Sequence, residues 1–244
     1  LRMILNIGAK FLGRASGIWE MEEDNEVHFR KSEELARRIH GADPEIILQT
    51  CIFEAIYREL EKVKIPPWVF EAFDLPSEDR CFRFDDMLFD NGPDGYIWGT
   101  YGAIPNIDKL EARMWFYYRA VRYIDAGYEA IHMGQIHLYS ADDRGYRKVY
   151  DLFGRIRRYA VKKARRHMVL LDAHTHGVSV NGRLLFDFHS IPFSRMPILD
   201  VPGEKLAFVK EGFSEGGVTP SGWECAVLPV LMEFDNWGGK FFRE

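Results

Sequence analysis

The 244-residue chain is 47% hydrophobic and 28% charged, a composition that supports a sizeable folded core and excludes a disordered chain. Its net charge of −5 argues against a general binder of nucleic-acid phosphates. Its three cysteines (Cys51, Cys81 and Cys225) are too few and too widely spaced for a disulfide framework or a zinc cluster, and no run of about 18 apolar residues predicts a membrane span.

Short apolar runs that end on a polar residue recur along the chain. In chain order they cover residues 3–8, 45–53, 128–134, 168–171, 184–186 and 227–232. Runs of this length suit strands that are covered on both faces, as the strands of parallel sheets are. The runs therefore predict a parallel sheet.

Helical patterns lie between several of these runs. Residues 32–39 predict a short helix with Ser32 as its N-cap. Residues 109–125 and 146–166 repeat apolar side chains with a period near 3.6 residues, and the last turn of the second stretch is basic. Strands that alternate with helices at this spacing are typical of βαβ units.

Two segments interrupt the alternation. Residues 64–108 predict a long loop excursion with one short helix near residues 68–73, and Asn181-Gly182 predicts a tight hairpin. About five or six strands can be counted, whereas a (β/α)8 barrel has eight in roughly 250 residues. We therefore expect one α/β domain over residues 1–244, a (β/α)8 TIM-type barrel that is incomplete or has irregular strands.

Polar residues follow the predicted strands at the end where parallel α/β folds bind ligands. Lys10 and Arg14 follow the first run, Glu54 the second, Gln135 and His137 the third, Asp172 and His174 the fourth, Asp187 and His189 the fifth, and Glu233, Asp235 and Asn236 the last. So many polar strand ends predict a functional rim. Trp223 lies in a loop just ahead of the last run and places an aromatic ring near it.

The polar strand ends resemble those of the TIM-barrel glycoside hydrolases, at the level of the superfamily. In that superfamily a carboxylate at a late strand often serves as nucleophile, which implies Glu233 for that role. The Asn-Glu pair that marks the acid/base in its largest clan is absent, so Glu54 and Asp172 remain alternatives for the acid. The resemblance implies a hydrolase that cleaves glycosidic bonds of an oligosaccharide or glycan, without a cofactor.

Such chemistry needs two carboxyl groups, about 5–5.5 Å apart for retention of configuration or about 6.5–9.5 Å apart for inversion. Hydroxyl groups of the sugar would be bound by Lys10, Arg14, Gln135, His137 and His174, with Asp187, His189, Asp235 and Asn236 on the same rim. The rings of Trp19, Trp98, Trp223 and Trp237 would stack on sugar faces.

A metal-dependent hydrolase or sugar isomerase is the competing prediction. The segment Asp172-Ala-His174-Thr-His176 resembles the His-x-His of amidohydrolase barrels, which bind Zn. An oxygen-rich set for Mg or Mn would comprise Glu129, His132, Asp172, Asp187 and Glu233, although Glu129 is expected at the wrong end of its strand. A third possibility is a carbohydrate-binding barrel without catalysis.

Structural roles compete with these functional ones. Glu54 could cap a helix, Asp187 could pair with Arg183 or Arg195, and His132 could be a hydrogen-bonded core residue. The chain has no phosphate loop and no Gly-x-Ser-x-Gly elbow. Because Leu1 is not followed by a leader, we expect a protein that is cytoplasmic or exported with its signal removed, and the oligomeric state stays open.

Overall fold

The computed structural model describes residues 1–17, 24–90, 97–98, 102–175, 178–192, 198–200, 207–209 and 216–233. Its contacts divide the chain into two compact units, Leu1–Leu170 and Leu171–Glu244. The single domain expected from the sequence stays a prediction.

A parallel sheet of four strands organises the first unit, and the fourth of them begins at Leu170, the last residue of that unit. Its order is β1-β2-β5-β6, formed by β1 (Phe11–Ser16), β2 (Ile47–Cys51), β5 (Ala130–His132) and β6 (Leu170–Asp172). The register places Phe11 opposite Ile47, and Gln49 opposite Ala130. Neighbouring strands follow one another along the chain, as βαβ units require.

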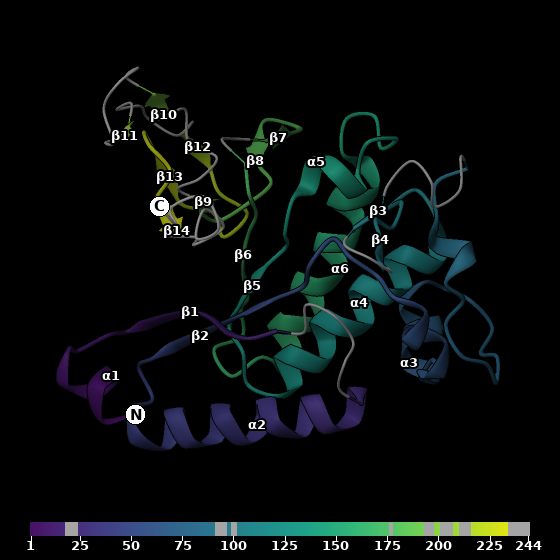
Figure 1. Cartoon of the computed structure of the whole chain (residues 1–244), viewed down its shortest axis with the longest axis horizontal. Coiled ribbons are helices and arrows are strands. Elements are labelled where there is room, and N and C mark those ends of the chain that lie inside the picture. The colour runs from purple at the N-terminus through teal and green to yellow at the C-terminus, as the bar shows by residue number, and fades with distance from the viewer. Residues whose placement is uncertain are drawn as a thin grey trace, which may run out of the picture. The chain divides into compact units, whose positions relative to one another are not determined.

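Three long helices connect these strands: α2 (Asn25–Ala42), α4 (Leu110–Asp125) and α6 (Arg147–Lys163). The carboxylate of Asp24 caps α2 by accepting hydrogen bonds from the backbone N–H groups of Glu26 and Val27. Helix α6 buries one apolar stripe, comprising Val149, Leu152, Phe153, Ile156 and Ala160, and lies beside α4 (Figure 1).

Shorter elements complete the first unit. They are α1 (Arg2–Asn6), η1 (Arg58–Lys62), α3 (Pro67–Ala72), η2 (Asp85–Met87), β3 (Ile97–Trp98), β4 (Gly102–Ala103) and α5 (Ile136–Tyr139). Helix α5 follows β5 directly, so it lies at the carboxyl end of the sheet.

The second unit consists of short strands among its described residues. These are β7 (Ser179–Val180), β8 (Arg183–Leu184), β9 (His189–Pro192), β10 (Ile198–Asp200), β11 (Ala207–Val209), β12 (Gly217–Val218), β13 (Glu224–Cys225) and β14 (Val230–Glu233). Strands β9 and β14 pair in parallel, and the other pairs are antiparallel.

Alternate residues of β2 point to opposite faces of the sheet. The side chain of Thr50 lies near the hydroxyl of Tyr123 on α4, so it lies on the face that the helices cover. Gln49 points to the other face, where it contacts Arg14 of β1, and Arg14 in turn contacts His132 of β5. We call Arg14, Gln49 and His132 the polar face of the sheet.

The predicted α/β class, the parallel sheet, the helices at 109–125 and 146–166 and the Asn181-Gly182 hairpin are confirmed. The predicted strand at residues 3–8 is wrong, because α1 occupies that segment and β1 begins only at Phe11. The short helix at 32–39 is wrong in its bounds, because Asp24 caps the helix and Ser32 is buried within it. The short helix predicted near residues 68–73 is confirmed as α3, and the long excursion over residues 64–108 also carries η2, β3 and β4.

Candidate functional site

Glu54 lies just past the end of β2, and its side chain is buried, with 2% of the residue exposed. Its Oε2 accepts a hydrogen bond from the backbone N–H of Gln135 at 3.0 Å, and its Oε1 accepts one from Nε2 of Gln135 at 2.6 Å. Gln135 itself lies just past the end of β5. The two sequence-predicted residues therefore meet at the carboxyl end of two adjacent parallel strands.

Gly134 makes this approach possible. Its φ is +61°, a left-handed conformation that is energetically unfavourable for any residue with a Cβ atom. A Cβ at this position would lie 2.0 Å from Oε2 of Glu54, which is far inside van der Waals contact. Only glycine fits, so the sequence Gly134-Gln135 forms a cradle for the carboxylate.

Two other buried carboxylates of the first unit, Glu129 and Glu111, are neutralised by arginine. Oε1 of Glu129 lies 2.8 Å from Nη2 of Arg165 and 2.8 Å from Nε of Arg166. Glu111 binds Arg80 through both carboxylate oxygens, at 2.6 and 2.9 Å. Glu54 is instead held by two neutral donors of Gln135, as buried Asp143 is held by the backbone N–H groups of Lys148 and Val149.

The polar face contains a strained residue. Arg14 has φ +48° within an irregularity of the β1–β2 register, a conformation that is rare for a residue other than glycine. Its backbone N–H donates to Oε1 of Gln49 at 3.0 Å, and its Nη2 lies 3.3 Å from Nε2 of the buried His132. The guanidinium also lies 5.8 Å from the ring centre of Phe53. Backbone strain of this kind concentrates at ligand-binding sites.

In the second unit, Asp172 is buried at the end of β6 and accepts a hydrogen bond from Oγ of Ser190. Asp187 is also buried; its carboxylate accepts from the backbone N–H of Leu171 at 3.0 Å and from Oγ of Ser221 at 2.5 Å. Asp187 thus joins two backbone segments of this unit. The predicted pairing of Asp187 with Arg183 or Arg195 stays a prediction, because Arg195 lies outside the described residues.

The remaining predicted site residues are spread over both units. Lys10 precedes β1, at the amino end of the sheet, and forms ion pairs with Asp43 at 2.7 Å and Glu45 at 2.9 Å. His137 is exposed on α5. His189 is buried in β9, His174 forms a parallel bridge with Ser190, and Trp223 is 41% exposed.

Glu233 is the last residue of β14, where the sequence predicts a catalytic carboxylate, but its side chain lies outside the described structure. Trp19, His176, Arg195, Asp235, Asn236 and Trp237 lie outside the described residues, as does the side chain of Trp98. Within the first unit the structure thus brings Glu54 to Gln135 and Arg14 to His132, while Lys10 stays at the other end of the strands.

Sequence reasoning missed Gly134, which lies against this carboxylate on the turn before α5, and Tyr139, which is buried on α5 itself. A glycine between a strand and a short helix was the available signal for the first. Tyr139 is fully buried, and burial, followed by the charge of Glu54, raises the pKa of its hydroxyl well above the ordinary value. Nothing in the spacing of the sequence identifies it.

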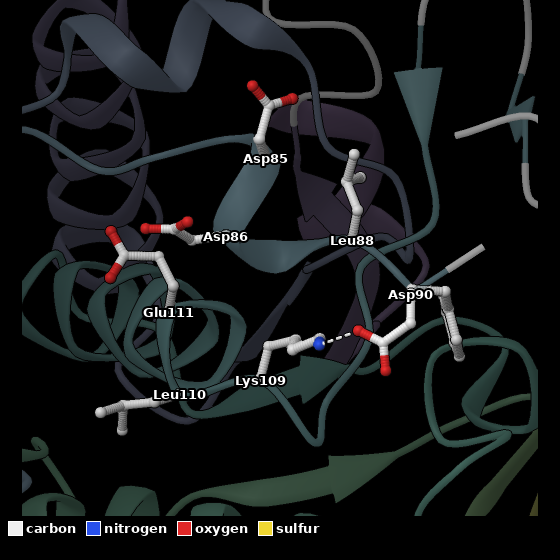
Figure 2. Close-up of a pocket in the computed structure, with 8 residues that line it drawn as sticks. Asp85, Asp86, Leu88, Asp90, Lys109, Leu110 and Glu111 are labelled. Atoms are coloured by element: carbon white, nitrogen blue, oxygen red, sulfur yellow. Dashed lines mark hydrogen bonds and ion pairs between the residues drawn. The ribbon is translucent and has the colours of Figure 1, made fainter. Parts of the chain in front are cut away.

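A surface hollow of about 580 Å³ lies between η2 and the start of α4 (Figure 2). Its carboxylates are each bound to a cation: Asp85 to Arg58, Asp86 to Arg83, Asp90 to Lys109 and Glu111 to Arg80. Because a cation neutralises each of these carboxylates, the hollow is less suited to proton transfer than the buried carboxylate of Glu54.

Among the described residues, no group of three or more His, Cys, Asp or Glu side chains is arranged to hold a metal ion. In the same part of the chain, no helix combines the length and the apolar character that crossing a membrane requires. No protein-family model matches the chain, and no curated protein matches it.

Proposed function

We propose that the chain is a carbohydrate-active hydrolase that cleaves glycosidic bonds with paired carboxyl groups at the carboxyl ends of barrel strands. Glu54 is one member of the pair, and Asp172 or Glu233 is the other. The substrate is an oligosaccharide or glycan whose hydroxyl groups would be bound by the half-buried Arg14 of the polar face.

The environment of Glu54 carries the proposal. A catalytic carboxyl group must take up and release a proton during turnover, and a strongly bound cation opposes this by favouring the charged form. Glu54 is buried at the end of a parallel strand and is held by two neutral donors of Gln135. Glu129 is equally buried but is bound to two arginines on the amino side of the same sheet.

The strand order supports the barrel that this chemistry needs. In the four-stranded sheet each strand neighbours the next one along the chain, which is how (β/α)8 barrels are built. Strands β9 and β14 of the second unit also pair in parallel. The ends of β2, β6 and β14 carry Glu54, Asp172 and Glu233, the three carboxylates from which the proposed pair is drawn.

The test is a comparison of four variants on a panel of glycans and aryl glycosides that the native chain cleaves. Glu54→Gln is expected to lower kcat by about 10²–10⁴, the usual contribution of general acid–base catalysis. Asp172→Asn and Glu233→Gln identify its partner, since only one of them should lose activity to the same extent. Glu129→Gln is the matched control, because it removes an equally buried carboxylate from the other end of the sheet and should keep kcat.

Azide distinguishes the two roles. In a retaining enzyme, azide restores turnover to an alanine variant of the nucleophile as a glycosyl azide of inverted configuration, and to an alanine variant of the acid/base as one of retained configuration. Full activity of Glu54→Gln on every cleaved glycan would remove Glu54 from the pair.

Other outcomes point to the competing functions. Loss of turnover after dialysis against EDTA, with recovery on adding Zn²⁺, Mg²⁺ or Mn²⁺, would favour a metal-dependent hydrolase or isomerase. Glycan binding without turnover in any preparation would favour a carbohydrate-binding protein.

A further inference from the structure

The buried hydroxyl group of Tyr139 lies at the same end of the sheet as the candidate site. The residue is fully buried on α5, and its ring packs against Phe116 of α4 with 5.1 Å between ring centres. Within the described residues, its hydroxyl oxygen makes no hydrogen bond. A buried donor without a partner costs free energy, so such groups are rare unless a further molecule or a small movement satisfies them.

Tyr139 lies one helical turn after Gln135, the residue that holds the Glu54 carboxylate. Tyr139 follows Gln135 by four residues, and residues at this spacing lie on the same face of a helix. Helical side chains lean toward the preceding turn, which here is the turn where Gln135 holds the Glu54 carboxylate. The charge of Glu54 is also among the causes that raise the pKa of Tyr139, together with that of Tyr146 at the N-cap of α6.

Glu54 has room for another donor. An ionised carboxylate offers about four acceptor positions on its two oxygens. Gln135 occupies two of them, one on each oxygen. The described residues thus place an acceptor with spare capacity and a donor without a partner at the same end of the sheet.

We infer that the Tyr139 hydroxyl donates a hydrogen bond to the Glu54 carboxylate, directly after a small rotation or through one water molecule, and so acts as a positioning residue for Glu54. This third donor stabilises the ionised form of the carboxylate and fixes the direction in which its proton leaves. Only the catalytic role of that proton rests on the proposed function. The hydrogen bond itself needs no substrate.

The experiment follows the titration of the Glu54 side-chain carboxyl carbon by ¹³C NMR in the full chain, with Glu54→Gln used to assign the signal. Tyr139→Phe keeps the ring and removes the hydroxyl. Because a donor to the ionised form is lost, the titration midpoint should rise by about one pH unit, a tenfold increase in proton affinity.

Two further variants make the result specific. Replacing Tyr139 by 3-fluorotyrosine keeps the hydroxyl but makes it more acidic, so the midpoint should move down. Tyr159→Phe is the matched control, because its hydroxyl donates to a different carboxylate, that of Asp125, at 2.7 Å. It should leave the Glu54 midpoint unchanged.

An unchanged midpoint in both Tyr139 variants would overturn the inference, and the fluorotyrosine arm decides the question if Tyr139→Phe fails to fold. Because the titration uses no substrate, a chain that cleaves no glycan would still give a clear result. Failure of the hydrogen bond and failure of the proposed hydrolase activity are therefore observed separately.

Discussion

Gln135 holds Glu54 with both of its amide groups: the side-chain Nε2 donates at 2.6 Å and the backbone N–H donates at 3.0 Å. The two residues follow the adjacent strands β2 and β5, so each strand end fixes the position of the other. Neither donor carries a charge, which orients the carboxylate without committing it to the ionised form as strongly as an arginine would.

The glycine before Gln135 provides the first prediction. Gly134→Ala would place a methyl group 2.0 Å from Oε2 of Glu54 in a left-handed conformation, so either the turn or the carboxylate must move. We expect the free energy of unfolding to fall by roughly 3 kcal/mol, of which about 1–2 kcal/mol comes from the backbone conformation and the rest from the clash.

Gly145→Ala is the matched control for this variant, measured alongside it by urea denaturation. Gly145 has φ +74°, but nothing lies within 4 Å of the position that a Cβ would take there, so only the conformational cost of about 1–2 kcal/mol applies. Equal losses in the free energy of unfolding of the two variants would show that the Glu54 carboxylate moves away from the added methyl group without cost.

A buried histidine on the helical side of the sheet provides a second prediction. His28 of α2 contacts the hydroxyl of Tyr123 at 2.8 Å, and burial, followed by the nearby charge of Arg119, lowers the pKa of His28 from 6.5 to about 3. Between these two pH values the unfolded chain binds more protons at this residue than the folded chain does. Stability contributed by neutral His28 is therefore lost as the pH falls below about 6.5, with a slope of up to about 1.4 kcal/mol per pH unit.

His28→Gln removes this titration while keeping an amide that can hydrogen-bond Tyr123. Unfolding by urea at a series of pH values from 7 to 4 should show a shallower loss of stability for the variant than for the native chain. Parallel curves would mean that His28 is protonated in the folded protein at no cost, contrary to its burial.

The sequence predicts the strands and helices best where burial and periodicity agree. The run 45–53 and the helix at 109–125 are apolar because they are buried, and both predictions hold. Residues 3–8 are equally apolar, yet Met3 and Ile7 are more than 70% exposed, so apolar character there does not report burial. Because a strand was predicted at residues 3–8, Lys10 was expected to follow a strand. In the structure Lys10 precedes β1 and pairs with Asp43.

The candidate site could be predicted only in part for a related reason. The position of a carboxylate after a strand identifies Glu54, but its contact with Gln135 depends on the register between β2 and β5, which is set by residues far apart in the sequence. Whether a carboxylate is neutralised is also a tertiary property. Glu129 lies near the start of the same apolar run that Gln135 follows, and only the fold brings Arg165 to it.

The strain at Arg14 provides the last prediction, because strain and binding can be separated by two substitutions at one position. The left-handed φ of +48° disfavours alanine but not glycine. The free energy of unfolding of Arg14→Gly should therefore be about 1 kcal/mol higher than that of Arg14→Ala.

Both variants lose the guanidinium that contacts Nε2 of His132 at 3.3 Å. If Arg14 binds sugar hydroxyl groups, both should raise KM by about tenfold with kcat nearly unchanged, the pattern of uniform ground-state and transition-state binding. Arg14→Lys keeps the charge and should fall between them and the native chain. A fall in kcat at constant KM would instead assign Arg14 to stabilisation of the transition state, and equal stability of the glycine and alanine variants would show that the backbone at this position relaxes without cost.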